Sequence, residues 1–297
     1  MTKAVLGIIG GSGVYDFPHL ENARWERIET PWGEASDELR FGELDGLAMV
    51  FLPRHGRGHK ISPTDINYRA NIDAMKRAGV TDLVSVSACG SFREELSPGT
   101  FVIVDQFIDR TFAREKSFFG KGLVAHVSLA QPVSPGLAAR VEAAAKAEDI
   151  PHQMGGTYLA MEGPQFSTLA ESNLYRSWGC DVIGMTNMPE AKLAREAEIC
   201  YSSVAMVTDY DCWHDDHGEV DVPEIIRVLM ENVEKAGRLI ENLARSFPQD
   251  HEACPIGSDR ALEHAIITQP GAHDPSLVAK LDAVAGRVLA PVAARKE

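Results

Sequence analysis

The sequence has no long hydrophobic run and only a few cysteines. No segment of the 297 residues approaches the roughly 20 consecutive apolar residues that a membrane-spanning helix needs, so we expect no membrane partner. The chain enters a predicted strand soon after Met1, without the apolar core and cleavage site of a signal peptide. The cysteines are odd in number, and none forms a C-x-x-C pair (Cys89, Cys180, Cys200, Cys212 and Cys254). We therefore expect reduced thiols and a cytoplasmic location.

Positive charge is also scarce. The chain has 29 Lys and Arg against 43 Asp and Glu, for a net charge of −14. A nucleic-acid partner would require a basic face, so this charge balance argues against one. A small anion can still bind to an acidic protein through a local cluster of donors. The overall composition is typical of a globular protein, and no Pro-, Ser- or Gly-rich linker divides the chain, which favours one large α/β domain.

Several common site signatures are absent. After the predicted strand at 4–9, Asp16 stands where the dinucleotide-binding fingerprint needs its third glycine. No Gly-Lys-Ser/Thr of a Walker loop follows, and no G-x-S-x-G elbow surrounds Ser87 or Ser91, which argues against a serine hydrolase. The His-Asp-Asp-His run at 214–217 suggests metal ligands, but four adjacent residues cannot readily close around one ion. We interpret it as a solvated loop and expect no metal.

Hydrogen-bond donors follow three predicted buried strands, at 4–9, 47–52 and 82–87. The first strand leads into a Gly-Gly-Ser-Gly turn and the third into Ser-Ala-Cys-Gly-Ser, while Arg54 and His55 follow the second. The planar guanidinium of Arg54 suits a phosphate group, and His55 can donate beside it. Because parallel strands bring their carboxyl ends to one edge of a sheet, these donors should meet there and form an anion site.

The stretch at 204–213 contains two carboxylates at the end of an apolar run. The run is typical of a strand buried on both faces, and Asp209 and Asp211 follow it on either side of a tyrosine. At the carboxyl end of a strand, these acids could transfer a proton or bind the polar edge of a ligand. The alternative is an Asp-rich turn that caps the next helix, and the sequence alone does not decide between the two.

Two further turns contain candidate binding residues. Phe166 follows a Gly-Pro turn and could stack on an aromatic ligand or be an ordinary core residue. Thr186 lies just ahead of a helix that Pro189 and Glu190 open with favourable first-turn chemistry, which makes Thr186 a donor beside an anion-favouring helix end.

Hydrophobic periodicity predicts the main helices. The predicted segments are 66–78, 135–147 and 223–244, with two weaker ones near 258–267 and 275–289. Residues 105–125 read as an excursion from the sheet. We divide the chain into a main domain at 1–247 and a C-terminal helical extension at 248–297, which we expect to pack on that domain or on a neighbouring subunit.

Six motifs in order resemble the methylthioadenosine phosphorylases of the purine nucleoside phosphorylase family, over about residues 5–245. The motifs are Gly-Gly-Ser-Gly at 10–13, Arg-His-Gly at 54–56, Ala-Cys-Gly-Ser at 88–91, Glu-Gly-Pro-x-Phe at 162–166, Gly-Met-Thr-x-Met-Pro-Glu at 184–190 and Thr-Asp-Tyr-Asp-Cys-Trp at 208–213. The resemblance implies one α/β domain with a central mixed β-sheet flanked by helices, assembled as a homotrimer, with a hexamer as the alternative. It also implies phosphorolysis of methylthioadenosine to adenine and 5-methylthioribose 1-phosphate, with inorganic phosphate as co-substrate and no cofactor.

The resemblance also assigns roles to particular residues. It places the phosphate contacts on Ser12, Arg54, His55, Ser87, Ala88 and Thr186. It places the nucleoside contacts on Cys89, Gly90, Phe166, Met185, Asp209 and Asp211. Asp209 would be the general acid at purine N7, and Asp211 would assist at the base. His126 resembles the residue that the family contributes to a neighbouring subunit's pocket.

Substrate preference depends on a few positions where related enzymes differ. Relatives that cleave inosine and guanosine resemble this chain but carry Asn at position 209 and Glu at 167, where this chain has Asp209 and Ser167. A histidine in those relatives binds the 5'-hydroxyl at position 222, where Val222, Ile225 and Ile226 offer an apolar slot for a methylthio group. One departure from closer relatives is a glycine at 184, where they often have asparagine.

Several alternatives remain open at this point. Adenosine or methylthioinosine could be the preferred substrate, and a nucleosidase would cleave the same bond without phosphate. A non-catalytic nucleoside-binding protein and a metal hydrolase are further alternatives from other classes.

Overall fold

The structure is a computed structural model of the chain that describes residues 2–11, 13–14, 17–214 and 222–290. Within these ranges, no helix is both long and apolar enough to cross a membrane.

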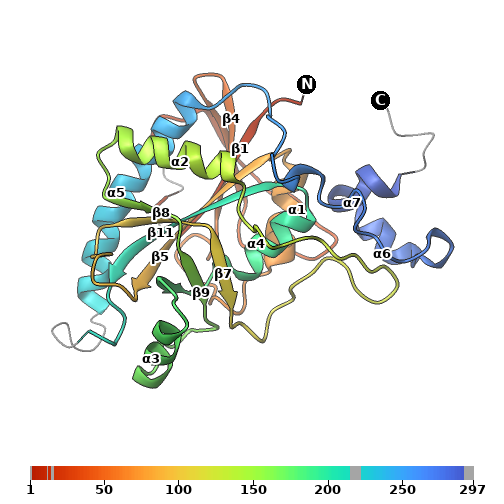
Figure 1. Ribbon diagram of the computed structural model, residues 1–297. Helices are drawn as coiled ribbons and strands as arrows, with labels where there is room; N and C mark the ends of the chain where they lie inside the picture. The colour runs from red at the N-terminus through yellow and green to blue at the C-terminus, as the bar shows by residue number, and fades with distance from the viewer. Residues whose placement is uncertain (1, 12, 15–16, 215–221, 291–297) are drawn as a thin grey trace.

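A large mixed β-sheet forms the centre of the molecule (Figure 1). The described residues contribute eleven strands to it: β1 (Val5–Gly10), β2 (Glu21–Glu26), β3 (Leu39–Leu44), β4 (Leu47–Pro53), β5 (Asp82–Ser91), β6 (Phe101–Val104), β7 (Gln106–Asp109), β8 (His152–Met154), β9 (Thr157–Ala160), β10 (Val182–Gly184) and β11 (Cys200–Asp209). The main path runs β2-β3-β4-β1-β5-β10-β9-β7. The sheet branches at β5, which also pairs with β11, and from there the branch continues through β6 to β8.

The strands β4, β1, β5 and β11 run parallel to one another. They are almost wholly buried, as expected for apolar strands that helices cover on both faces. Their carboxyl ends therefore meet at one edge of the sheet, which confirms the predicted convergence of the strand ends. The short strand β10 pairs antiparallel to the end of β5 at Gly90 and Ser91, and it brings the loops after β9 and β10 to the same place.

Helices cover both faces of the sheet (Figure 1). The helices of the described residues are α1 (Tyr68–Arg77), α2 (Pro135–Ala147), α3 (Leu169–Ser177), α4 (Asn187–Glu196), α5 (Val222–Ser246), α6 (Pro275–Lys280) and α7 (Asp282–Leu289). One core layer packs α2 and α5 against the sheet, and a second packs α1, α4 and α7 against the opposite face. The predicted fold class, a single mixed sheet flanked by helices, is confirmed.

Most predicted helices are present, but one is wrong. The predicted helix at 135–147 has the bounds of α2, and α1 starts at Tyr68 because the Asn67 side chain caps it. The segment 258–267 contains only a short 3-10 turn at Ser258–Arg260. There, the Leu262 side chain is buried, and its backbone N–H donates to Glu198 at 2.9 Å, so docking on the core replaces helical hydrogen bonding.

The described part of the C-terminal segment packs on the main domain. Leu281, Val284 and Ala285 belong to the same core layer as α1, and Arg287 forms an ion pair with Glu198 at 2.6 Å. The division at residue 247, and any contact of this segment with a neighbouring subunit, remain predictions.

Candidate active site

A cavity of about 270 Å³ opens where the parallel strands β1, β4, β5 and β11 end. The loops after β9 and β10 close it on the other side. The predicted site residues that line it are Arg54, His55, Ser87, Ala88, Cys89, Gly90, Phe166, Met185, Thr186, Asp209, Asp211 and Ile225. Predicted site residues as far apart in the sequence as Arg54 and Ile225 therefore share one cavity.

The remaining predicted residues lie elsewhere or outside the described parts. Ser12 is outside the described residues, and so is the side chain of Val222. Ile226 is 52% exposed and is not among the residues that line the cavity, although Ile225 is. The His126 backbone N–H donates to Ala265 at 2.9 Å, and this residue also does not line the cavity.

Arg54 lies at the predicted phosphate end, but its guanidinium is largely occupied. Nε donates to Glu190 at 2.8 Å and Nη2 to the same carboxylate at 3.2 Å, while Nη1 donates to the Val86 carbonyl at 3.0 Å. Both side chains of this ion pair are 1% exposed. Although burial opposes the charged form, Glu190 raises the pKa of Arg54. The fork that was assigned to phosphate thus pairs with Glu190, and only the second N–H of Nη1 has no partner among the described residues.

His55 carries no charge near neutral pH. Burial lowers the pKa of His55 to about 4. Its Nδ1 lies 2.9 Å from the Ile61 carbonyl, so Nδ1 carries the proton and Nε2 is an acceptor. The ring stacks on His59, with 4.3 Å between ring centroids, and His59 also lines the cavity. A phosphate oxygen can therefore hydrogen-bond to Nε2 only if that oxygen is protonated and donates.

Neutral donors from two other strand ends complete this end of the cavity. The Ser87 hydroxyl donates to Asn187 at 3.1 Å, and Asn187, fully buried, donates in turn to Ser203. Thr186 is the residue just before α4. Regular helical geometry begins only after Met188, whose backbone is extended, so the predicted placement of Pro189 in the first turn holds.

Asp209 and Asp211 form the opposite end of the cavity. Asp209 Oδ1 accepts the Asp211 backbone N–H at 2.8 Å, and Oδ2 accepts the Thr208 hydroxyl at 2.7 Å. The same hydroxyl lies 3.2 Å from the Cys89 carbonyl. Burial raises the pKa of Asp209 and that of Asp211. When Asp209 is protonated, it can donate to Thr208, which then donates to Cys89, so the neutral acid keeps its hydrogen bonds.

Two neighbours fix the carboxylates in place. The Ser167 hydroxyl lies 2.9 Å from both carboxylate oxygens of Asp211. A Cβ at Gly90 would lie 2.9 Å from Asp209 Oδ1 and 3.3 Å from Asp211 Cβ, so only glycine lets the two acids approach this strand end. Ser167 therefore acts on the site through Asp211, although it does not itself line the cavity.

The glycine at 184 has a structural reason. A Cβ at this position would lie 1.9 Å from the Tyr158 hydroxyl, which occupies the space a larger residue would need. Tyr158 is fully buried. Position 184, where closer relatives often have asparagine, therefore holds a glycine in this chain because Tyr158 fills the space of a side chain.

Sequence reasoning missed several residues of this site. Asn187 and Glu190 stood inside a quoted motif but were interpreted only as part of a helix start, and Thr208 was passed over beside Asp209. His59 followed the Arg-His motif without an assigned role. Nothing in the sequence indicated Tyr158, because the sequence does not show that its strand, β9, pairs with the strand of Gly184, β10.

The described residues contain no group of three or more His, Cys, Asp or Glu side chains able to hold a metal ion. His214 stacks on Tyr210, with 4.7 Å between ring centroids, and the other three residues of the His-Asp-Asp-His run lie outside the described ranges. The prediction of a solvated loop there is therefore not tested.

Donors for an anion lie at one end of the cavity, and two carboxyls whose pKa is raised by burial lie at the other. This arrangement suits an enzyme of acid-assisted group transfer to an anion. Comparison with known families specifies the class further. The chain belongs to the phosphorylase superfamily, whose family model matches residues 5–245. The predicted family and enzyme class are thereby confirmed.

Individual relatives agree with this assignment. An S-methyl-5'-thioadenosine phosphorylase of Bradyrhizobium diazoefficiens is 68% identical over 289 residues, covering 97% of this chain and 99% of the relative. The crystal structure of a methylthioadenosine phosphorylase from an antarctic soil metagenomic library has a TM-score of 0.86 at 45% identity and covers 96% of this chain and 99% of its own. A methylthioadenosine phosphorylase from Schistosoma mansoni in complex with adenine has a TM-score of 0.78 at 35% identity, covering 82% of this chain and 91% of its own.

Proposed function

We propose that this chain catalyses the reversible phosphorolysis of S-methyl-5'-thioadenosine to adenine and 5-methylthioribose 1-phosphate. The observation that carries the proposal is Asp209, a half-buried carboxyl with a raised pKa at the end of the cavity opposite the donors for phosphate. The similarity to methylthioadenosine phosphorylases over nearly the whole chain supports it.

In the forward reaction, Asp209 donates its proton to N7 of the departing adenine. Cleavage of the glycosidic bond leaves negative charge on the purine, and a neutral acid at N7 removes it. Desolvation raises the pKa of Asp209, which favours the protonated form that this step needs. After transfer, Thr208 can turn its hydroxyl to the new carboxylate, and Asp211 lies beside Asp209 to accept from the 6-amino group, directly or through water.

Phosphate acts as the nucleophile at the anomeric carbon. We assign its binding to Arg54 Nη1, Ser87, Thr186 and the backbone near Ala88, with Ser12 as a further donor by sequence. Because Glu190 neutralises Arg54 and His55 is uncharged, this end carries little net positive charge. The dianion therefore keeps its own charge to stabilise the oxocarbenium-like ribose, which favours attack.

The methylthio group fits the apolar part of the cavity. Ile225, Leu229 and Val233 of α5 line it on the side of the predicted slot. Burial of one thiomethyl group yields only about 1–3 kcal/mol of discrimination, so adenosine should be a poorer second substrate rather than an excluded one. Met185 would contact the ribose, and Phe166, which is 51% exposed at the cavity, would cover the base.

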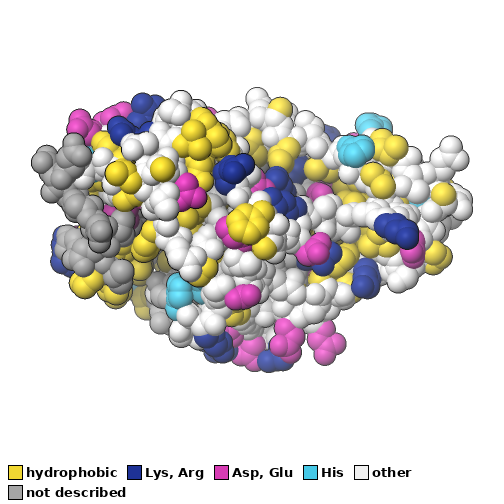
Figure 2. All heavy atoms as spheres, turned by 90° about the horizontal axis from the view of Figure 1, so that it is seen from below, with side chains coloured by type: hydrophobic (Ala, Val, Ile, Leu, Met, Phe, Trp, Pro, Cys, Tyr) yellow, Lys and Arg dark blue, Asp and Glu magenta, His cyan; other side chains and the backbone are white. Residues whose placement is uncertain are grey.

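We propose a homotrimer as the assembly, with a hexamer as the alternative. Apolar side chains lie in the surface of the face seen in Figure 2, on which α3 lies. The exposed apolar residues in and near α3 are Leu169, Leu174 and Trp178, and Phe112 is 82% exposed. Large apolar side chains exposed on one face are typical of subunit contacts. His126 would reach a neighbouring subunit's cavity in this assembly.

The test is adenine release from methylthioadenosine, measured with and without inorganic phosphate. We expect release that requires phosphate and yields 5-methylthioribose 1-phosphate. Equal rates without phosphate would indicate a nucleosidase and contradict the proposal. Faster turnover of adenosine or methylthioinosine in the same assay would replace the proposed substrate, and recovery of unchanged nucleoside would indicate a binding protein.

A further inference from the structure

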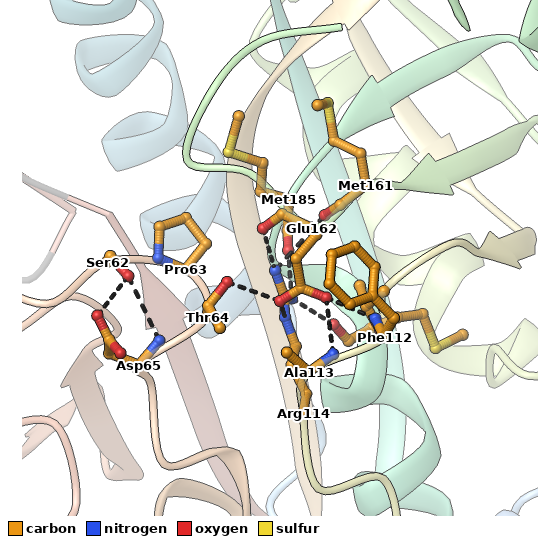
Figure 3. Close-up of polar contacts among 12 residues, drawn as sticks. Ser62, Pro63, Thr64, Asp65, Phe112, Ala113, Arg114, Met161, Glu162 and Met185 are labelled. Carbon is orange, nitrogen blue, oxygen red and sulfur yellow. Dashed lines mark hydrogen bonds and ion pairs between the residues drawn. The ribbon is translucent and has the colours of Figure 1, made fainter.

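One buried carboxylate, Glu162, joins three loops around the cavity (Figure 3). Its Oε1 accepts the Thr64 hydroxyl at 2.6 Å and Nε of Arg114 at 3.0 Å. Its Oε2 accepts two backbone N–H groups, from Phe112 at 2.5 Å and Ala113 at 3.1 Å. The loop after β4, the loop after β7 and the loop after β9 therefore meet at a single side chain.

Arg114 extends this network to a fourth loop. Nη1 lies 2.5 Å from the Met185 carbonyl, 2.7 Å from the Met188 carbonyl and 2.9 Å from the Tyr68 hydroxyl. Nη2 donates to the Glu162 carbonyl at 2.7 Å. The Arg114 side chain is 1% exposed, so its five N–H donors need partners inside the protein. The Glu162 carboxylate, these carbonyls, the Tyr68 hydroxyl and the Met161 carbonyl at 3.5 Å provide them.

The loops that meet here carry residues of the cavity. Pro63 precedes Thr64 and lines the cavity, as do Met161, next to Glu162, and Met185, whose carbonyl Arg114 holds. In Figure 3 the loops that carry Pro63, Met161 and Met185 lie around the Glu162 carboxylate, and the dashed contacts join them. A shift of Glu162 or Arg114 would therefore displace both the ribose side and the phosphate side of the cavity, since Thr186 directly follows Met185.

Glu162 differs chemically from the two aspartates of the site. Burial would raise the pKa of Glu162, but hydrogen bonds from Thr64, Phe112, Ala113 and Arg114 outweigh it and lower the pKa to about 2. The side chain therefore remains a carboxylate at any pH at which the enzyme would work. It cannot donate a proton to the substrate, and its contribution must be geometric.

We propose that Glu162 and Arg114 are positioning residues that hold the ribose- and phosphate-binding loops in register, with the Thr64 hydroxyl linking the loop of Pro63 to them. The inference rests on the proposed function, because it concerns the positions of Met185 and Thr186 toward a nucleoside and phosphate. It assigns no proton transfer to any of the three residues. Their effect acts on the Michaelis constants and on the rate through the placement of other groups.

The first test compares Thr64→Val with Thr64→Ser. Valine removes only the hydroxyl that reaches Glu162, whereas serine keeps it. We expect Thr64→Val to raise the KM for both phosphate and methylthioadenosine by about 3–10-fold, since a hydrogen bond to a charged group is lost, and Thr64→Ser to restore values near those of the wild type. Equal kinetics for the two variants and the wild type would overturn the role of Thr64.

The second test replaces Glu162 itself and uses Glu196 as a matched control. Glu196 is also a buried carboxyl that accepts a backbone N–H, from Phe118 at 2.7 Å, and a hydroxyl, from Ser117. Neither of its chain neighbours lines the cavity, whereas Met161, next to Glu162, does. Glu162→Gln replaces one carboxylate oxygen, which accepts from two donors, by an NH2 group that can only donate. We expect the loops to shift and kcat/KM to fall about 100-fold. Glu196→Gln should leave kcat/KM within about 3-fold of the wild type, in line with a substitution away from the site.

Two readouts separate positioning from general loss of structure. The alkaline limb of the pH–rate profile should stay where it is in Glu162→Gln, because Asp209 still supplies the proton. The loss of kcat/KM should also persist well below the unfolding temperature of the variant. If Glu162→Gln and Glu196→Gln lose activity to the same extent, or if Glu162→Gln keeps wild-type KM values, the positioning role is refuted.

Binding measurements keep this inference distinct from the proposed reaction. Calorimetric titration of wild type and variants with inorganic phosphate, and with methylthioadenosine, reports the loop positions without turnover. Wild-type protein that binds both ligands but does not react would refute the proposed function only. Unchanged dissociation constants and unchanged kinetics in Glu162→Gln, with an active wild type, would refute the positioning role only.

Discussion

The Tyr158 hydroxyl lies 1.9 Å from the position that a Cβ at Gly184 would occupy. The ring carbon that bears the hydroxyl is 2.6 Å from the same position, so removal of the oxygen alone would not make room for a side chain. Strands β9 and β10, which pair in parallel, fix this spacing. The glycine at 184 and the tyrosine at 158 are therefore one structural unit beneath the cavity.

Gly184→Ala should consequently damage both stability and activity. The added methyl group overpacks a site with no free space, which typically costs about 1–3 kcal/mol of unfolding free energy. It should also displace Met185 and Thr186, which follow directly. Urea denaturation and steady-state kinetics measure the two effects. The double variant Gly184→Ala, Tyr158→Leu should recover part of the lost activity, and an unperturbed single variant would contradict the close contact.

Asp209→Asn should abolish the alkaline decline of the rate. In the wild type, the protonated form of Asp209 is the acid, and burial raises its pKa. The rate should therefore fall as pH rises through this raised pKa. An amide cannot ionise, so the variant should be slow, by about 100-fold or more for loss of a general acid, and flat over the same range. A variant that keeps the wild-type pH profile would exclude Asp209 as the titrating acid.

Glu190→Gln should destabilise the fold more than a surface substitution. It removes the charge that balances Arg54 while both side chains stay buried. Loss of one partner of a buried ion pair costs about 3–5 kcal/mol, which urea denaturation would detect. Inorganic phosphate should restore more stability to this variant than to the wild type, because the anion can then pair with Arg54. Equal phosphate stabilisation of both proteins would contradict the view that Glu190 occupies the guanidinium.

Glu196 should make the unfolding free energy depend on pH. Burial raises the pKa of Glu196 from 4.5 to about 7. Between these values the folded chain holds a proton that the unfolded chain has released, so stability falls as pH rises through this window, by up to about 1.4 kcal/mol per pH unit. Glu196→Gln mimics the protonated acid and should remove this slope. An identical slope in the variant would assign it to other groups.

The sequence was sufficient for the features that depend on one segment at a time. The buried strands, the bounds of α2 and the position of Asp209 and Asp211 at the end of β11 follow from apolar patterning and from the rule that ligands bind where parallel strands end. Most of the predicted residues that line the cavity lie next to such an end, and the resemblance to a family supplied their proposed roles.

Features that depend on contacts between segments could not be predicted. Arg54 was assigned a free guanidinium because nothing in the sequence indicates that Glu190, 136 positions away, would lie against it. The segment 258–267 has helical periodicity. However, the Leu262 N–H donates to the Glu198 carboxylate, and the segment packs on the core without forming an α-helix. The meeting of Thr64, Arg114 and Glu162 likewise exists only in the folded chain.

In the proposed reaction, a proton passes to N7 of the purine as phosphate attacks the ribose. The most direct test of this proton transfer is the rate of phosphorolysis of a 7-deaza analogue of methylthioadenosine, in which carbon replaces N7, compared with the natural nucleoside. We expect the analogue to bind and to compete with methylthioadenosine. Neither the wild type nor Asp209→Asn should cleave it at a measurable rate. Cleavage of the analogue at a rate comparable to that of methylthioadenosine would contradict this proton transfer.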